Sequence, residues 1–156
     1  MLFRSQKGYT QSQIRQLMKE ADSMAKLRLT MMLRGVFEEM ATFPEAKGQA
    51  YGLLKKKLKT ILKAIKRLTH PLDASEIRDI KDQANRSIFS LIKEDYLQVC
   101  IHLEATPDHV GLMRKRDRFK TVLTRLKKET DINEDLKPKQ FQDLSFLSDL
   151  NVVEAA

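Results

Sequence analysis

Apolar residues recur every three or four positions through most of the chain, and this spacing limits the fold more than any other feature. Between residues 54 and 68 the apolar positions fall on one side of a helix, without the alternation that a half-buried strand requires. Only 5 glycines and 4 prolines interrupt the 156 residues, and β-branched residues are sparse. The sequence therefore predicts an all-α protein.

The first predicted helix opens at a capping box formed by Thr10 and Gln13 and ends near Phe43-Pro44. Residues three and four apart share a face of a helix, so we expect one apolar stripe to face the core. The predicted stripe consists of Ile14, Leu17, Met18, Ala21, Ala25, Leu29, Met32, Val36 and Met40. The methionines of this helix fit either core filling or an adaptable groove for a partner, and we predict core filling for Met18, Met24, Met31 and Met32.

Three further helices follow, each with a local signal. The second spans about 46–69 and ends ahead of a proline, because the residue before proline disfavours helix. Asp73 and Glu76 form a second capping box, which opens a third helix ending near Ala105. A capping threonine, a proline and an acid at 106–108 predict the start of a fourth helix.

Long helices with short connections predict an antiparallel helical bundle of four main helices, plus a short C-terminal helix. We expect residues 1–129 to form a basic helical bundle and residues 130–156 an acidic tail. After Pro138, apolar residues spaced by three predict the short amphipathic helix. These residues are Phe141, Leu144, Leu147 and Leu150. They pack on the same domain or dock on a partner, and the sequence leaves both open.

The formal net charge is +8, but the two parts of the chain differ in sign. Residues 1–129 hold 27 basic and 15 acidic residues, a net charge of +12. Residues 130–156 hold 2 basic and 6 acidic residues, a net charge of −4. A positive body attracts phosphate polymers or anionic membrane surfaces, so charge points to partners of these two classes.

The second predicted helix concentrates its cations on one side. With about 100° per residue, its basic residues fall within about 60° of the pole opposite the apolar stripe. They are Lys56, Lys59, Lys63, Lys66 and Arg67, flanked by Lys55 and Lys57. No acid occurs between Gly48 and His70, whereas ordinary solvated faces mix both signs.

The fourth predicted helix repeats this pattern less cleanly. Its outward residues include Asp117 as well as four cations. The cations are Arg114, Arg118, Arg125 and Lys128. A guanidinium can clamp phosphate oxygens in a bidentate manner, so arginines favour phosphate contact. Arg116 falls within the apolar stripe and is expected either to reach an edge of the stripe or to pair in an interface.

Rows of this kind match contact with a nucleic-acid backbone. Successive turns present a cation about every 5 to 6 Å, which suits a chain of phosphates. If a face binds four to six phosphates, log affinity falls with log salt at a slope of roughly −3 to −5. With three tyrosines and no tryptophan the chain is poorly supplied with base-stacking groups, so we expect backbone binding without sequence readout. The alternative reading is that the lysines only keep a helical protein soluble.

No catalytic residue, metal site or cofactor is predicted. None of the three histidines has an acid three residues before it, so the Glu-x-x-His pairing of di-iron bundles is missing. His102 lies beside the core stripe and is expected to be partly buried, and His109 is expected to cap the fourth helix or to be solvated. Cys100, the only cysteine, is expected to pack as a small buried hydrophobe.

The chain also lacks an apolar stretch near the roughly 20 residues that cross a bilayer, and the first nine residues lack an apolar signal core. We therefore expect a cytoplasmic protein without a membrane partner. A lysine-rich helix lying on an anionic membrane is a weaker reading, because interfacial tryptophan is missing.

The stretch Thr10-Gln-Ser-Gln-Ile-Arg-Gln-Leu17 resembles the Thr-x-Ser-Gln-Ile-Arg stretch that begins the small helical subunit of type III CRISPR effector complexes. The likeness covers about eight of the 156 residues. It implies a basic helical bundle without catalytic activity, stacked along a ribonucleoprotein and contacting guide or target backbone. Arg15 is the basic residue that lies within the matched stretch.

These observations lead to one functional hypothesis and one alternative. The hypothesis is a non-catalytic subunit of a ribonucleoprotein effector complex. It binds the backbone of RNA or single-stranded DNA, contacts larger protein subunits, and can self-associate along a strand. The alternative is a helical structural or adaptor protein, such as a phage assembly factor or chaperone, that binds another protein.

Overall fold

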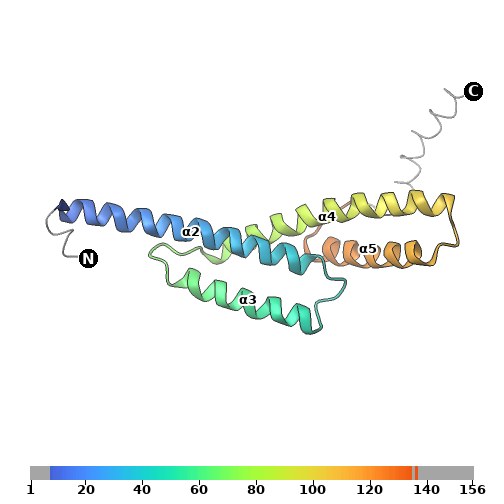
Figure 1. The fold of residues 1–156 in the computed structure, drawn as a ribbon, viewed down its shortest axis with the longest axis horizontal. Helices are drawn as coiled ribbons and strands as arrows, with labels where there is room; N and C mark the ends of the chain where they lie inside the picture. The colour runs from blue at the N-terminus through green and yellow to red at the C-terminus, as the bar shows by residue number, and fades with distance from the viewer. Residues whose placement is uncertain (1–7, 135, 137–156) are drawn as a thin grey trace, which may run out of the picture. The chain divides into compact units, whose positions relative to one another are not determined.

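The computed structural model describes residues 8–134 and Leu136. The helices are α2 (Gln11–Ala41), α3 (Gln49–Lys66), α4 (Ala74–Ala105) and α5 (Val110–Glu129), and no strand occurs in the described residues (Figure 1). The predicted all-α class is therefore confirmed, whereas the antiparallel bundle of all four helices stays a prediction. The predicted C-terminal helix, with Phe141, Leu144, Leu147 and Leu150, lies outside the described residues.

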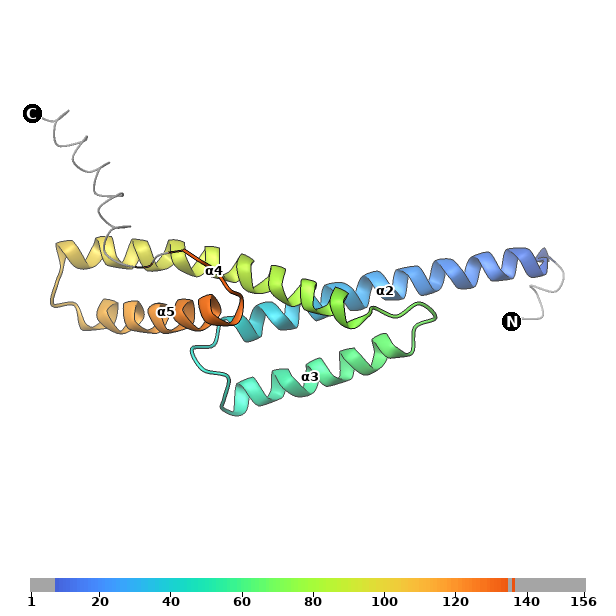
Figure 2. The ribbon, with the colours of Figure 1, turned by 180° about the vertical axis from the view of Figure 1, so that it is seen from behind.

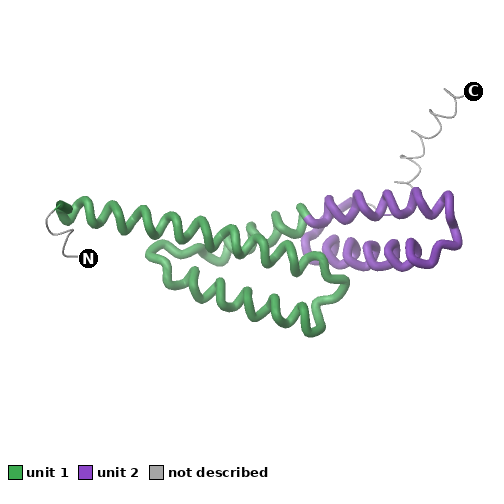
Figure 3. Tube along the Cα trace, viewed as in Figure 1, with its two compact units in different colours: residues 1–87 green, residues 88–156 purple. Residues whose placement is uncertain are grey.

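The chain divides into two compact units, residues 1–87 and residues 88–156, and the boundary falls inside α4 (Figure 3). At 1.5 Å per residue, α4 with its 32 residues is about 48 Å long, whereas α3 and α5 are about 27 and 30 Å long. A short helix covers only part of such a long one, so the two parts of α4 contribute to separate cores. The predicted division into 1–129 and 130–156 depends on a tail mostly outside the described residues, and it stays a prediction.

The core of the first unit forms where α2, α3 and the first part of α4 meet. Both views show α3 running back alongside the C-terminal half of α2, and these two helices are in direct contact (Figures 1 and 2). The buried residues of this core are Leu33, Val36, Phe37, Met40, Tyr51, Ile61, Ile65 and Ala84. Each large apolar side chain that is fully buried stabilises the fold by roughly 1.5 to 3 kcal/mol relative to exposure. This core holds α3 with the opposite side of the helix directed to solvent.

A backbone conformation at one end and a hydrogen bond at the other mark the two ends of α3. Gly48, immediately before α3, has a φ of 101°, a conformation that favours glycine, and α3 begins after it rather than near residue 46. Beyond the other end of α3, the backbone N–H of Thr69 donates to Oδ1 of Asp22 at 3.0 Å. The loop that follows α3 is thereby tied to α2.

The methionines of α2 contradict the predicted core filling. Met18, Met24, Met31 and Met32 are all exposed, as are Ile14 and Leu17 of the predicted stripe. The buried residues of α2 lie in its last third, between Leu33 and Ala41. With 18 residues, α3 covers α2 over only part of its length, and α2 carries apolar residues on two of its faces. The predicted stripe was therefore correct at Leu29, Val36 and Met40 but wrong at Met32 and at its positions from Ile14 to Ala25.

Both predicted capping boxes are confirmed. The N–H of Gln13 donates to Oγ1 of Thr10 at 3.2 Å, and the N–H of Thr10 donates to Oε1 of Gln13 at 2.8 Å. Asp73 and Glu76 form the same reciprocal pair at 2.8 and 3.2 Å. Such caps satisfy amide groups that have no partner within the helix, which is why short sequence signals locate these starts.

The predicted start of the fourth helix is wrong by a few residues. The Oγ1 of Thr106 donates to the carbonyl of His102 at 2.9 Å, so this threonine closes α4 rather than opening α5. His109 is the N-cap of α5, with Nδ1 accepting the N–H of Leu112 at 3.1 Å. The capping role expected for His109 is thus confirmed, while His102 is exposed rather than partly buried.

The second unit has its own core, formed by the second part of α4 and by α5. Both views show α5 running back along this part of α4 (Figures 1 and 2). The buried apolar residues are Ile88, Phe89, Ile92, Tyr96, Val99, Leu103, Val122, Leu123, Leu126 and Ile132. After α5, Lys93 forms an ion pair with Glu134, which connects the segment following α5 to α4.

Candidate nucleic-acid interface

The cations of α3 stand on the side of the helix that points away from the core. Tyr51, Ile61 and Ile65 are buried on the inner side, with Leu54 and Leu58 packed against the same core. Because side chains advance by about 100° per residue, residues two positions from this stripe point outward. Every predicted contact residue on α3 is exposed: Lys56, Lys59, Lys63, Lys66 and Arg67. The flanking Lys55 and Lys57 are exposed as well.

No carboxylate of the described residues forms an ion pair with this row. The ion pairs found within 4.0 Å in the described part of the chain all involve cations elsewhere, on α2, α4, α5 and the α2–α3 loop. α3 itself contains no acidic residue. We call the five residues Lys56, Lys59, Lys63, Lys66 and Arg67 the α3 basic row.

The spacing within the α3 basic row is regular. At 1.5 Å per residue, Lys56, Lys59, Lys63 and Arg67 follow one another at axial steps of about 4.5 to 6 Å. Thr60 lies along the same side, but its hydroxyl donates to the carbonyl of Lys56 at 3.2 Å. The row therefore offers positive charge on flexible side chains, which suits contact with successive phosphates and carries no fixed pattern for reading bases.

The cations predicted on α5 divide into two groups. Arg114, Arg118 and Lys128 are exposed. Arg125 is different, because its Nε lies 2.9 Å from Oε2 of Glu129 and its side chain is only 16% exposed. Arg116, placed by the sequence in the apolar stripe, pairs with Asp117 at 3.2 Å. Two arginines of α5 are thus already paired with acids of the same helix.

Other groups that could carry chemistry do not converge on a site. In the described part of the chain no cluster of three or more His, Cys, Asp or Glu side chains could hold a metal ion. Burial raises the pKa of the Cys100 thiol, and burial together with the adjacent Cys100 raises the pKa of the Tyr96 hydroxyl. A thiol held in its neutral form is a poor nucleophile.

No known protein family, curated protein or solved structure matches this chain. In the residues that the structure describes, no helix combines the length and apolar character needed to cross a membrane.

The sequence located the α3 basic row but missed one exposed surface. This surface is the outward side of α2, where Leu17, Met24 and Met31 are 48 to 68% exposed. The signal that could have found it is their seven-residue spacing, which differs from the 3.6-residue period of a helix that buries one face in a globular core.

Proposed function

We propose that the protein is a non-catalytic subunit that binds the backbone of RNA or single-stranded DNA through the α3 basic row. The observation that supports this most strongly is the absence of ion pairs within the described chain for five exposed cations on one side of one helix. Keeping like charges together without acids is unfavourable in the free protein. A phosphate chain would relieve that repulsion while releasing its own counterions.

The arginines of α5 provide a second contact in this proposal. Arg114 and Arg118 are exposed and belong to a helix with an acid at Asp117 between them. Their contribution is therefore smaller than that of the α3 basic row. Arg125 is left out of the proposed contact surface because Glu129 already accepts its Nε–H.

The likeness of residues 10–17 to small CRISPR subunits extends the proposal to a ribonucleoprotein effector complex. In that setting, larger subunits would hold the chain, and phosphate contacts would come from the helix faces rather than from the matched stretch. The exposed side chain of Arg15 is the basic group that the likeness itself contributes.

The test is a binding titration with a labelled single-stranded RNA of mixed sequence and about 20 nucleotides, longer than the roughly 4–16 that one small domain covers. The wild-type chain should show a slope of log affinity against log salt of roughly −3 to −5. Lys59→Glu combined with Lys63→Glu should lower the affinity about 100-fold and make the slope shallower by about two units.

The matched control is Arg78→Glu combined with Lys81→Glu on α4. These cations are also exposed, and the substitutions change the net charge equally, but Asp79 and Asp82 lie among them. The control should change the affinity by no more than about threefold. Equal losses in both variants, or an unchanged affinity in the α3 variant with its helical signal intact, would overturn the proposal.

The adaptor alternative is favoured by a different observation, the exposed apolar side of α2. An adaptor would co-purify with another protein in a complex that survives nuclease and high salt. Phosphate-mediated association would dissociate under the same conditions.

A further inference from the structure

α2 carries a second apolar face, directed away from the core of the first unit. Leu33 and Phe37 on the inner face are buried, whereas every residue from 11 to 20 is exposed. A helix on the surface of a globular unit normally presents polar residues on its outer side. Here the outer side is lined by apolar side chains that are 36 to 68% exposed: Ile14, Leu17, Met24, Leu27, Met31 and Met32. We call these six residues the α2 apolar face.

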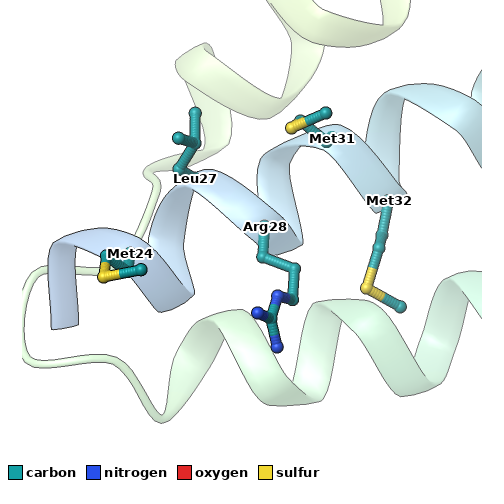
Figure 4. A pocket seen from close by; sticks show the side chains of 5 residues that line it. All are labelled: Met24, Leu27, Arg28, Met31 and Met32. Atoms are coloured by element: carbon teal, nitrogen blue, oxygen red, sulfur yellow. The ribbon is translucent and has the colours of Figure 1, made fainter. Parts of the chain in front are cut away.

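Part of the α2 apolar face forms an open hollow of about 520 Å³ (Figure 4). Its lining comes from α2 alone and contains four apolar side chains and Arg28. Leu27 and Met31 leave the helix on one side, while Arg28 and Met32 leave it on the other (Figure 4). The hollow is therefore shallow and lies open between these side chains.

The spacing of this face indicates what fits it. Positions alternate by three and four residues from Ile14 to Met31, which is the repeat that packs one helix against another. We call these six positions the seam of α2, and they are Ile14, Leu17, Ala21, Met24, Arg28 and Met31. Over the same segment the opposite side carries polar residues, including Arg15, Lys19, Ser23 and Lys26. The segment is therefore amphipathic about a seam that no described part of the chain covers.

We infer that the α2 apolar face binds the same face of a second copy of this chain, with the two α2 helices antiparallel. At roughly 100 Å² of apolar surface for each large side chain, six side chains offer about 600 Å² per copy. Two copies can then bury up to about 1,200 Å², at the lower end of the range of about 1,200 to 2,000 Å² that stable interfaces need. A twofold interface uses one patch twice, so a single self-complementary seam is sufficient.

The charge within the seam selects the antiparallel orientation. Arg28 is the one charged residue at a seam position, and a parallel pair would place the two Arg28 side chains opposite each other. In the antiparallel pair, Arg28 lies opposite Leu17 of the other copy and one turn from its Glu20. The small Ala21 then lies opposite the large Met24, so the side chains near the twofold axis are complementary in size. The two arginines are separated by about 16 Å along the axis.

The test measures molar mass by size exclusion with light scattering after nuclease treatment, in about 1 M salt, where phosphate bridging is screened. This inference does not depend on the proposed function, and the salt removes dimers formed through nucleic acid. The wild-type chain should have twice the 18.1 kDa chain mass. Leu17→Glu combined with Met24→Glu should raise the dimer dissociation constant at least about 100-fold, because two charges are placed within the seam.

The matched control is Ser12→Glu combined with Ser23→Glu, which adds the same charge to exposed positions of α2 outside the seam. This variant should remain a dimer, and both variants should keep the wild-type helical signal. A wild-type chain that is monomeric at all concentrations overturns the inference. So does a control variant that dissociates as readily as the seam variant, or an α2 face that is covered only in complex with a different protein.

Cysteine cross-linking tests the orientation in a Cys100→Ala background. Leu17→Cys and Arg28→Cys chains, when mixed, should form a disulfide between copies, because the two positions face each other in the antiparallel pair. Arg28→Cys alone should form none, since its two copies lie too far apart. The reverse pattern would show a parallel pair and overturn the assigned orientation.

Discussion

α3 and α5 are both basic helices, but they differ in whether acids pair with any of their cations. The cations of the α3 basic row are exposed and form no ion pair with a described residue. On α5, Arg116 pairs with Asp117 and Arg125 pairs with Glu129. The number of cations on a helix therefore does not determine how strongly that helix binds phosphate. An arginine that is already bonded to a carboxylate must exchange one anion for another.

The largest expected effect comes from reversing charge on each helix in turn. Lys59→Glu with Lys63→Glu on α3 should lower RNA affinity about 100-fold, whereas Arg114→Glu with Arg118→Glu on α5 should lower it about tenfold or less. The same labelled-RNA titration measures both. A loss from the α5 variant that equals or exceeds the loss from the α3 variant would reverse the ranking of the two helices.

A second prediction concerns Cys100 and Tyr96 of the second unit, whose pKa values are raised by burial. Because burial raises the pKa of Cys100 above its ordinary value of 9.0, the native thiol should react about tenfold more slowly with a thiol reagent near pH 9 than the urea-unfolded chain. Burial also raises the pKa of Tyr96 above 10.0. The unfolded state therefore loses these protons first. The contribution of these two groups to stability should be fully present below the pKa values of the unfolded chain and be lost as the pH rises above about 9.

The thiol reaction is followed by absorbance and the alkaline change by urea unfolding at a series of pH values. Cys100→Ala should reduce the slope of stability against pH. Equal reaction rates in the native and unfolded chain would show that the Cys100 thiol is not protected.

The smallest expected effect separates stability from binding with single substitutions. Arg125→Gln should lower the free energy of unfolding by about 0.5 to 1 kcal/mol, because it removes a partly exposed ion pair, and should leave RNA affinity nearly unchanged. Lys63→Gln should do the opposite, lowering affinity about three- to tenfold with a stability change within about 0.5 kcal/mol. Chemical unfolding and RNA titration on both variants distinguish the two roles.

Lys59, Lys63 and Arg125 show which properties of a site residue can be predicted from the sequence. The exposure of Lys59 and Lys63 follows from helical periodicity alone, since the apolar stripe on the other side of α3 has only one way to face a core. Arg125 has the same periodicity on α5, yet Glu129 lies one turn away and accepts its Nε–H. Whether such a neighbour folds onto the arginine or leaves it in solvent depends on packing around both side chains.

The starts of the helices also differ in whether the sequence could predict them. The boxes at Thr10 and Asp73 were predictable because both partners lie within four residues of each other. The start of α5 was not, because Thr106 has two uses: its hydroxyl can cap a following helix or bond back to His102, as it does here. His109 then takes the cap position of α5.

The amino-acid order alone determined the long helices, two of their N-terminal caps and the side of α3 that carries only positive charges. These are consequences of interactions within a few turns of one helix. Tertiary structure alone decided that α4 serves two cores and that α2 buries Leu33 and Phe37 while leaving Leu17, Met24 and Met31 in solvent. The physical reason is that a side chain is buried only when a second surface packs against it. A helix with apolar residues on two sides does not specify which side its neighbour will cover.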